Sequence, residues 1–319
     1  MTGAPRRLLL LIQNALPPAL NMGWDEALGL AVRRGRVDGF LRFYRWSPPT
    51  LSFGYFQKPS RILLPEAKSH AGLGLVRRAS GGKMVFHDQE WTFSCGMPID
   101  LLKHQQTSAH PDGFLGWFQT LLGPLVETLC GLGIPVRFPE PRLPNRSGTG
   151  SGKGVFEVAP DSPAVRDRVH CFYAAAGHSL MVQGKKLIGA AGIARDGVLV
   201  IHGSLPIARS SLLPPVFCQR VDPEAGLETA FLSDFLDQQT IASLPAKVAE
   251  RLAATFRLDN GQIPGAALPE QQLSVLAETL ARRKYDDLDW PACDQSEYEG
   301  LIDDFFQSST VISVGKFRF

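Results

Sequence analysis

The sequence has few cysteines and little net charge, and each shortage excludes a class of protein. Its five cysteines (Cys95, Cys130, Cys171, Cys218 and Cys293) include no Cys-x-x-Cys pair, which argues against a zinc site and against a disulfide framework. The formal net charge of +2 argues against a dedicated nucleic-acid-binding protein, which usually carries a strongly basic face. We therefore expect no bound metal and no nucleic-acid partner.

Long hydrophobic runs are also missing, whereas a membrane span needs about 20 consecutive apolar residues. The opening segment MTGAPRRLLLLI imitates a signal peptide, but its apolar run of five residues is short. The corresponding region of a signal peptide has roughly seven to fifteen residues. We therefore expect no membrane association and a cytoplasmic location, which the odd number of cysteines also favours.

What the sequence does contain is a regular series of strand and helix signals. Its 319 residues, 44% hydrophobic and 20% charged, are enough for a sizeable core. Segments rich in β-formers predict strands at 7–13, 39–46, 51–56, 75–79, 83–87, 91–97, 134–138, 178–183, 186–194 and 198–205. Helical spacing of apolar residues predicts helices at about 22–34, 112–130, 243–256 and 271–285.

Capping and turn residues mark the ends of several of these elements. Asn21 is the expected N-cap of the first helix, and Gly35 suits the position after its end. The pairs Gln183-Gly184 and Asp196-Gly197 predict tight hairpin turns. Turn formers dominate residues 139–168, which predicts an exposed loop, and the final residues TVISVGKFRF alternate like an edge strand.

Residues 169–205 contain the pair of side chains that a covalent acyl transfer needs. Cys171 precedes Lys186 by fifteen positions. A thiolate attacks a carbonyl carbon, and an ammonium group stabilises the oxygen that becomes negative. A free thiol is mostly protonated at neutral pH, so a catalytic one needs a nearby cation such as Lys185 or Lys186. Either residue alone has an ordinary structural explanation, so this hypothesis requires both to face one pocket.

The segment RRASGGKMVFHD (77–88) is the second candidate site. It places three cations around two glycines, which suits close approach and charge neutralisation of an anionic ligand. A basic hairpin turn is the ordinary alternative. Two histidines, His87 and His202, each end a predicted strand. A histidine in such a place is usually structural, but it is also able to act as a base or to orient another group.

Four segments resemble the lipoate–protein ligase and octanoyltransferase family, which shares its catalytic fold with biotin–protein ligases. They are NMGWDEAL (21–28), YRWSPPTLSFGYFQ (44–57), VRRASGGKMVFHDQEWTFS (76–94) and GKKLIGAAGIARDGVLVIHGSL (184–205). The resemblance implies an α+β fold in which helices flank a mixed, largely antiparallel sheet. We expect this catalytic domain to cover residues 1–240 and a small helical appendage to cover residues 241–319.

Two features are similar to the octanoyltransferase branch of Gram-positive bacteria. Lys83 stands where ATP-using ligases tend to carry a third glycine, and Cys171-Phe172 matches the position of the branch's acyl nucleophile. The resemblance implies that Cys171 takes the acyl group and that Lys186 binds its carbonyl oxygen. The residues that it implies for substrate binding are Arg77, Arg78, Gly81, Gly82, Lys83, His87, Gly189, Ala191 and His202.

The implied reaction moves an octanoyl or lipoyl group from octanoyl-acyl carrier protein through Cys171 to a lysine. The acceptor is a lipoyl domain or the glycine-cleavage H protein, and no cofactor is needed. An ATP-dependent lipoate–protein ligase is the first alternative, with ATP and Mg forming an acyl-adenylate held by Lys186. Ser179, Ala190 and Gly192 depart from the family pattern. They leave a non-catalytic fatty-acyl-binding protein as a further alternative.

Overall fold

The computed structural model describes residues 6–70, 72–108, 110–139, 177–212, 217–218, 229–259, 270–292 and 295–308. Its strands are β1 (Arg6–Leu16), β2 (Gly39–Trp46), β3 (Thr50–Phe53), β4 (Gly74–Arg77), β5 (Val85–His87), β6 (Glu90–Pro98), β7 (Ser179–Val182), β8 (Lys185–Arg195), β9 (Val198–Pro206) and β10 (Leu258–Asp259). Its longer helices are α1 (Pro18–Arg33), α2 (Ile99–Gln105), α3 (Phe114–Gly131), α5 (Gln238–Phe256), α6 (Glu270–Leu280) and α7 (Gln295–Ser308).

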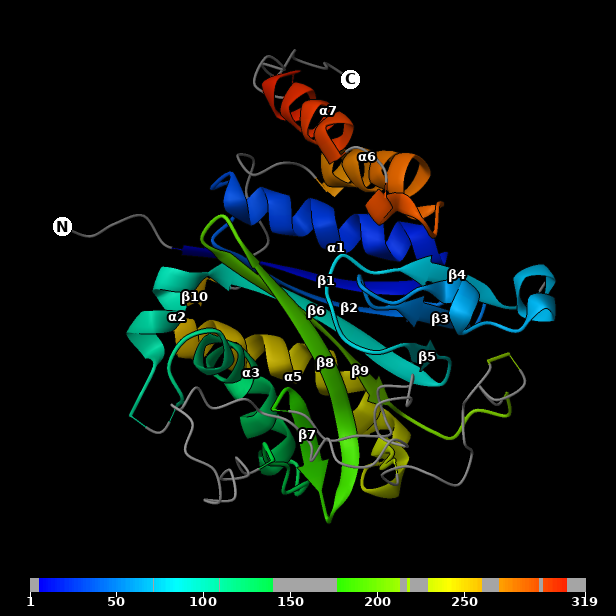
Figure 1. Cartoon of the computed structure of the whole chain (residues 1–319). Helices are drawn as coiled ribbons and strands as arrows, with labels where there is room; N and C mark the ends of the chain where they lie inside the picture. The colour runs from blue at the N-terminus through cyan, green and yellow to red at the C-terminus, as the bar shows by residue number, and fades with distance from the viewer. Residues whose placement is uncertain are drawn as a thin grey trace, which may run out of the picture.

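The strands form two sheets, and helices cover both faces of the larger one (Figure 1). The larger sheet has the order β10-β1-β2-β6-β9-β8-β7, and the smaller has the order β4-β3-β5. β1 runs parallel to β10 and β2, whereas the pairs from β2 to β7 are antiparallel. In the smaller sheet β3 is parallel to β4 and antiparallel to β5. The predicted mixed, largely antiparallel sheet flanked by helices is confirmed.

Two tight turns connect the last three antiparallel strands. Gln183 and Gly184 have φ angles of 49° and 79°, and Asp196 and Gly197 have φ angles of 50° and 75°. Positive φ at both central residues defines the hairpin turn whose twist matches that of the strands. Gly35, with φ of 64°, follows the end of α1. The predicted hairpins and the predicted helix end are therefore confirmed.

The start of α1 differs from the prediction. The helix begins at Pro18, with Pro17 before it, so Asn21 lies inside the helix and is not its N-cap. The Asn21 side chain is buried and donates to the carbonyl oxygens of Leu16 at 3.2 Å and Arg45 at 3.0 Å. Proline favours a first helical turn because its missing N–H has no partner to lose there. Asn21 instead links α1 by hydrogen bonds to β1, which precedes the helix, and to β2, which follows it.

The predicted strand at 134–138 is also absent from the described part of the chain. Only one isolated bridge forms there, between Arg137 and Met181. The expected loop from residue 140 onward and the expected strand at the C-terminal end lie outside the described residues.

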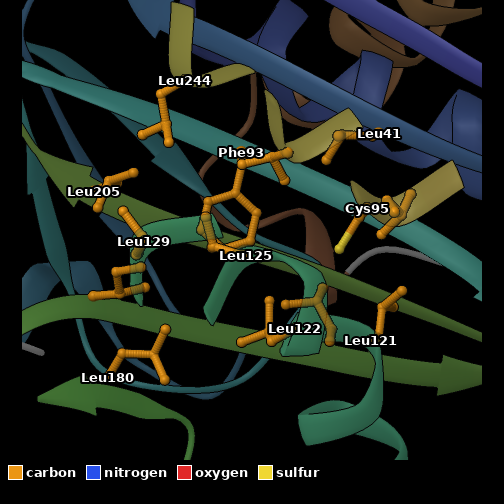
Figure 2. Close-up of a cluster of buried hydrophobic side chains, with 14 of the residues drawn as sticks. Leu41, Phe93, Cys95, Leu121, Leu122, Leu125, Leu129, Leu180, Leu205 and Leu244 are labelled. Atoms are coloured by element: carbon orange, nitrogen blue, oxygen red, sulfur yellow. The ribbon is translucent and has the colours of Figure 1, made fainter. Parts of the chain in front are cut away.

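One face of the larger sheet packs against α3 and α5 (Figure 1). Side chains at helical spacing along α3 lie beside side chains of the strands in one apolar cluster (Figure 2). The labelled members of this core are Leu41, Phe93, Cys95, Leu121, Leu122, Leu125, Leu129, Leu180, Leu205 and Leu244. Pro124 lies inside α3 without ending it.

The opposite face packs against α1, and α6 lies on the outer side of α1 (Figure 1). A Cβ atom at Gly23 of α1 would come within 2.2 Å of the Ala277 oxygen of α6, so only glycine permits this close helix contact. Residues 281–285 then form a π-helical turn, from which Lys284 Nζ binds the Glu26 carboxylate at 2.8 and 2.9 Å.

The helices expected to form one appendage therefore lie in different places. α5 packs against α3 in the core of the larger sheet, and β10 that follows it pairs with β1. α6 packs on α1 in a separate cluster. The two helices do not form one packed unit, and a division of the chain at residue 240 stays a prediction.

Among the helices of the described residues, none combines the length and the apolar character that a membrane crossing requires.

Candidate active site

A narrow, largely apolar pocket lies where the smaller sheet meets the larger one. Seven predicted substrate-binding residues line it: Arg78, Gly82, Lys83, His87, Gly189, Ala191 and His202. The structure thus brings the glycine-rich segment, β5, β8 and β9 to one place. The open space is about 40 Å³, which is room for about three water molecules. A medium-length acyl chain therefore requires the lining to widen.

Small residues create this pocket in the middle of the larger sheet. Gly189, Ala190 and Ala191 follow one another on β8 and all line it. Gly82 has φ of 93°, and a Cβ there would lie 3.6 Å from the Cβ of Ala191. These positions leave space that larger side chains would fill, which explains why a run of small residues interrupts an otherwise apolar strand.

Arg78 holds the glycine-rich segment in shape. Its guanidinium donates to the Ser52 carbonyl oxygen at 2.7 Å and to the Ser52 hydroxyl at 2.6 Å. It also donates to the carbonyl oxygens of Lys83 at 2.9 Å and Gly81 at 3.3 Å. Arg78 is buried. These hydrogen bonds join Arg78 to Ser52 and to the backbone of the glycine-rich segment, so it shapes the pocket wall.

Glu90 organises the floor of the pocket, although the sequence analysis did not select it. Its carboxylate binds His87 Nδ1 at 2.7 Å and accepts hydrogen bonds from the hydroxyls of Thr92 and Ser204. His87 Nε2 is 2.6 Å from the Ser52 hydroxyl, so both of its ring nitrogens are occupied. Trp46 stacks on the His87 ring at 4.3 Å between centroids. His87 is therefore a fixed part of the wall.

A second buried network, around Asp25, was also missed. Asp25 Oδ1 accepts from Arg42 at 2.7 Å and from the Ser94 hydroxyl at 2.6 Å, and Oδ2 accepts from the Tyr44 hydroxyl at 2.9 Å. Burial alone would raise the pKa of the Asp25 carboxyl, but Arg42, His202 and Ser94 outweigh it and hold that pKa below its ordinary value. Asp25 is therefore an anion inside the protein.

His202 connects the Asp25 network to the glycine-rich segment. Its Nδ1 lies 3.7 Å from Asp25 Oδ2, and its Nε2 lies 2.5 Å from the Ser80 hydroxyl. Burial lowers the pKa of His202 below its ordinary value; Arg78 and His87 act in the same direction and Asp25 opposes them. The imidazole is therefore neutral at neutral pH.

A wider groove of about 1180 Å³ adjoins the narrow pocket. It runs between α1, the turn that joins β8 to β9, and α7, and its lining includes Ser80, Gly81 and Arg195. Among the described residues, Met22 and His202 line both cavities. The structure therefore has a narrow end suited to an apolar tail and an open end suited to a larger partner.

Arg77 does not line either cavity within the described residues. Its guanidinium donates to the carbonyl oxygens of Leu288, Tyr55 and Gln57 and forms an ion pair with Asp289 at 3.2 Å. The Trp290 indole in turn donates to the Arg77 carbonyl oxygen at 3.2 Å. In this structure Arg77 fastens the segment after α6 to the smaller sheet, and its predicted role in substrate binding stays a prediction.

The proposed catalytic pair is placed only in part. Lys186 lies on β8, is 1% exposed, and is outside the lining of both cavities among the described residues. Burial, and next the charge of Lys186, lowers the pKa of His178, so the lysine is close enough to affect that imidazole. Cys171 lies outside the described residues. The convergence of Cys171 and Lys186 stays a prediction.

Within the described residues, His, Cys, Asp and Glu side chains form no group of three or more that is suited to hold an ion.

Known proteins match the part of the chain that contains the segments of this site. The family model of the lipoyl protein ligase A/B catalytic domain matches residues 17–219. The chain is 30% identical over 283 residues to octanoyltransferase LipM of Geobacillus kaustophilus, covering 86% of this chain and 94% of that protein. It is 35% identical over 187 residues to octanoyltransferase LipM of Kyrpidia tusciae, covering 59% of this chain and 61% of that protein.

Solved structures show the same fold at lower sequence identity. A putative lipoate protein ligase from T. acidophilum with bound lipoic acid has a TM-score of 0.63 and 23% identity over 90% of this chain and 99% of its own. A lipoate-protein ligase A bound with ATP has a TM-score of 0.65 and 22% identity over 90% of this chain and 98% of its own. Because the family model and a full-length relative agree with the pocket and its segments, the chain belongs to the lipoyl protein ligase A/B catalytic-domain family.

Proposed function

We propose that this protein is an acyltransferase that moves an octanoyl group from an acyl-carrier thioester to a lysine of a lipoyl domain. One observation carries this proposal. The chain is similar along 94% of the length of a protein named octanoyltransferase LipM. Lys83, which lines the narrow pocket, stands where ATP-using ligases tend to have a glycine. The pocket is largely apolar and buried polar groups hold its walls, so a fatty tail with a reactive carbonyl at the mouth would enter it once the lining widens.

The chemistry proceeds by two exchanges at one acyl carbon. The Cys171 thiolate attacks the octanoyl thioester, the new C–S bond forms, and the carrier thiolate leaves and takes a proton. The acceptor lysine then attacks the octanoyl-cysteine, an amide forms, and the Cys171 sulfur leaves as a thiol. The donor thioester already contains the activation energy, so neither ATP nor a metal takes part. Lys186 supplies the positive charge that stabilises the carbonyl oxygen in both exchanges.

The partners follow from this chemistry. The donor is octanoyl-acyl carrier protein, and the acceptor is a lipoyl domain or the glycine-cleavage H protein, in the cytoplasm. Lipoyl transfer is the same reaction with a different tail. The lipoate-protein ligase relatives include one bound with ATP, so ATP dependence with Mg is the alternative that the test must separate.

The experiment is transfer of octanoyl from purified octanoyl-acyl carrier protein to a lipoyl domain without ATP. We expect modified lipoyl domain with the wild type and none with Cys171→Ala. Cys130→Ala is the matched control, because Cys130 is an exposed cysteine on α3 and should leave the rate unchanged. Strict dependence on ATP with full activity of Cys171→Ala would select the ligase. Tight binding of octanoate without any transfer would select the acyl-binding protein.

A further inference from the structure

We propose that Ser80, His202 and Asp25 form a proton relay that removes a proton from the acceptor lysine. The inference rests on the proposed function and extends it to the second exchange. A lysine ammonium has no lone pair and must lose a proton before it attacks an acyl carbon. Its ordinary pKa is about 10.4, so at neutral pH the site must supply a base.

The three side chains come from three different elements and meet in a line. Asp25 is on α1, Ser80 is in the segment between β4 and β5, and His202 is on β9. The Ser80 hydroxyl lies 2.5 Å from His202 Nε2, and His202 Nδ1 lies 3.7 Å from Asp25 Oδ2. The second distance is longer than a hydrogen bond, and such contacts commonly tighten when substrate binds. The order of hydroxyl, imidazole and carboxylate is that of a general-base relay.

The carboxylate determines which ring nitrogen carries the proton. Asp25 is ionised and faces Nδ1, so Nδ1–H is the favoured tautomer and Nε2 has the free lone pair. Nε2 then accepts the hydrogen bond of the Ser80 hydroxyl. This leaves lone pairs of the Ser80 oxygen available to accept a proton from a donor in the groove that Ser80 lines.

The location of His202 supports this role. In the part of the chain that the structure describes, His202 and Met22 line both cavities, and the Met22 side chain is a thioether. An acyl tail in the narrow pocket and a lysine entering from the wide groove would meet at this boundary. His87 also lines the narrow pocket, but Ser52 and Glu90 occupy both of its nitrogens. His202 is therefore the better placed imidazole.

Burial, more than the surrounding charges, keeps the His202 ring neutral and able to accept a proton. Asp25 of α1 acts to keep a proton on it, whereas Arg78 after β4 and His87 of β5 oppose that charge. Burial lowers the pKa of His202 below its ordinary value. The relay should therefore stay able to accept a proton through the neutral range and lose that ability only in acid.

The protons balance over the exchange. The lysine ammonium passes one proton to Ser80 Oγ as the hydroxyl proton moves to His202 Nε2. The amine forms the C–N bond, the second amine proton leaves as the amide forms, and the C–S bond breaks. One proton ends on the released thiol and the other passes to solvent. His202 returns to its neutral form.

The test isolates the second exchange by starting from purified octanoyl-enzyme. Release of the octanoyl group is followed in a single turnover, with a lipoyl domain or with hydroxylamine as acceptor. Hydroxylamine is largely uncharged at neutral pH, so it needs no base. We expect His202→Gln to slow transfer to the lipoyl domain about 100-fold, the lower range of general-base effects. With hydroxylamine its rate should stay within about two-fold of wild type, and the deficit with lysine should narrow as pH rises.

Ser80→Ala provides a second variant if His202→Gln does not fold, and it should show the same preference for hydroxylamine. Equal losses with both acceptors, or no loss with either, would show that the three residues only hold the structure and would overturn the relay. If the wild type forms no octanoyl-enzyme, the proposed function fails and the relay fails with it. If octanoyl-enzyme forms and both variants transfer normally, only the relay fails.

Discussion

The ion pair between Arg42 and Asp25 gives the sharpest prediction about stability. Arg42 is 0% exposed and lies on β2 in the middle of the larger sheet. Its guanidinium donates to Asp25 at 2.7 Å, to the side chain and carbonyl oxygens of Asn21 at 2.7 and 3.0 Å, and to Gln13 at 2.6 Å. Arg42→Met keeps a long apolar side chain but leaves the buried Asp25 carboxylate without its cation.

The loss of stability in Arg42→Met follows from the Asp25 carboxylate that remains buried without a cation. Breaking one side of a buried ion pair costs about 3–5 kcal/mol, because the remaining ion stays desolvated. For 319 residues, the entropy of unfolding is about 0.7 kcal/mol per degree, so Tm should fall by about 4–8 °C if the chain unfolds in one transition. Arg45→Met is the matched control, because the Arg45 side chain is exposed on the same strand and stacks over Trp91. That change should cost under about 1 kcal/mol.

Thermal unfolding followed by circular dichroism measures both variants. The double variant Arg42→Met/Asp25→Asn removes both charges, so its free energy of unfolding should exceed that of Arg42→Met alone. An unchanged Tm for Arg42→Met, or a double variant less stable than the single one, would refute the reasoning.

The same pair predicts a dependence on pH. The folded pKa of Asp25 is held below its ordinary value, so the unfolded state takes up a proton first as pH falls. The contribution of Asp25 to stability is therefore complete above the ordinary carboxyl pKa of about 4 and is lost as pH falls through the lower folded pKa. The gap between wild type and Arg42→Met should be largest at neutral pH. It should shrink as pH falls, because Asp25 without its cation takes up a proton at a higher pH than Asp25 in wild type does.

Two further results are expected. Arg77→Ala should detach the segment 288–290 from the smaller sheet and destabilise the protein by about 1–3 kcal/mol, because carbonyl groups lose their hydrogen-bond donor. Limited proteolysis should then cleave this segment faster than in wild type, and an unchanged cleavage pattern would contradict the prediction. Among the described cysteines, the exposed Cys130 should react first with a thiol reagent at pH 8. Burial raises the pKa of Cys95 above its ordinary value and that of Cys218 to about 12, so rapid labelling of either in the folded protein, mapped by peptide mass, would be inconsistent with the structure.

Local sequence signals predicted the hairpins best. Gln183-Gly184 and Asp196-Gly197 need positive φ at adjacent residues, and glycine satisfies this wherever the rest of the chain lies. Asn21 shows the opposite case, because its partner at Arg45 belongs to a strand that the helix meets only in the folded protein. The periodic leucines of α5 and α6 predicted helices, but periodicity alone does not say which face of a sheet a helix covers.

The sequence predicted the glycine-rich wall of the site but not its buried acidic residues. Glycines and cations at Arg78–Lys83 marked the pocket because their composition is unusual. Glu90 and Asp25 were missed because an acidic residue is usually exposed. Their burial depends on partners that are distant in sequence, such as Ser204 for Glu90 and Arg42 for Asp25. For Asp25, the available sequence signal was its place directly after Trp24, which is buried in the structure.

Acylation of Cys171 is tested most directly by intact-protein mass spectrometry. The purified protein is mixed with octanoyl-acyl carrier protein in the absence of a lipoyl domain and of ATP. We expect one octanoyl group per chain, mapped to the peptide that contains Cys171 and removed by hydroxylamine. An unmodified wild-type protein, or an adduct that persists in Cys171→Ala, would contradict the covalent mechanism.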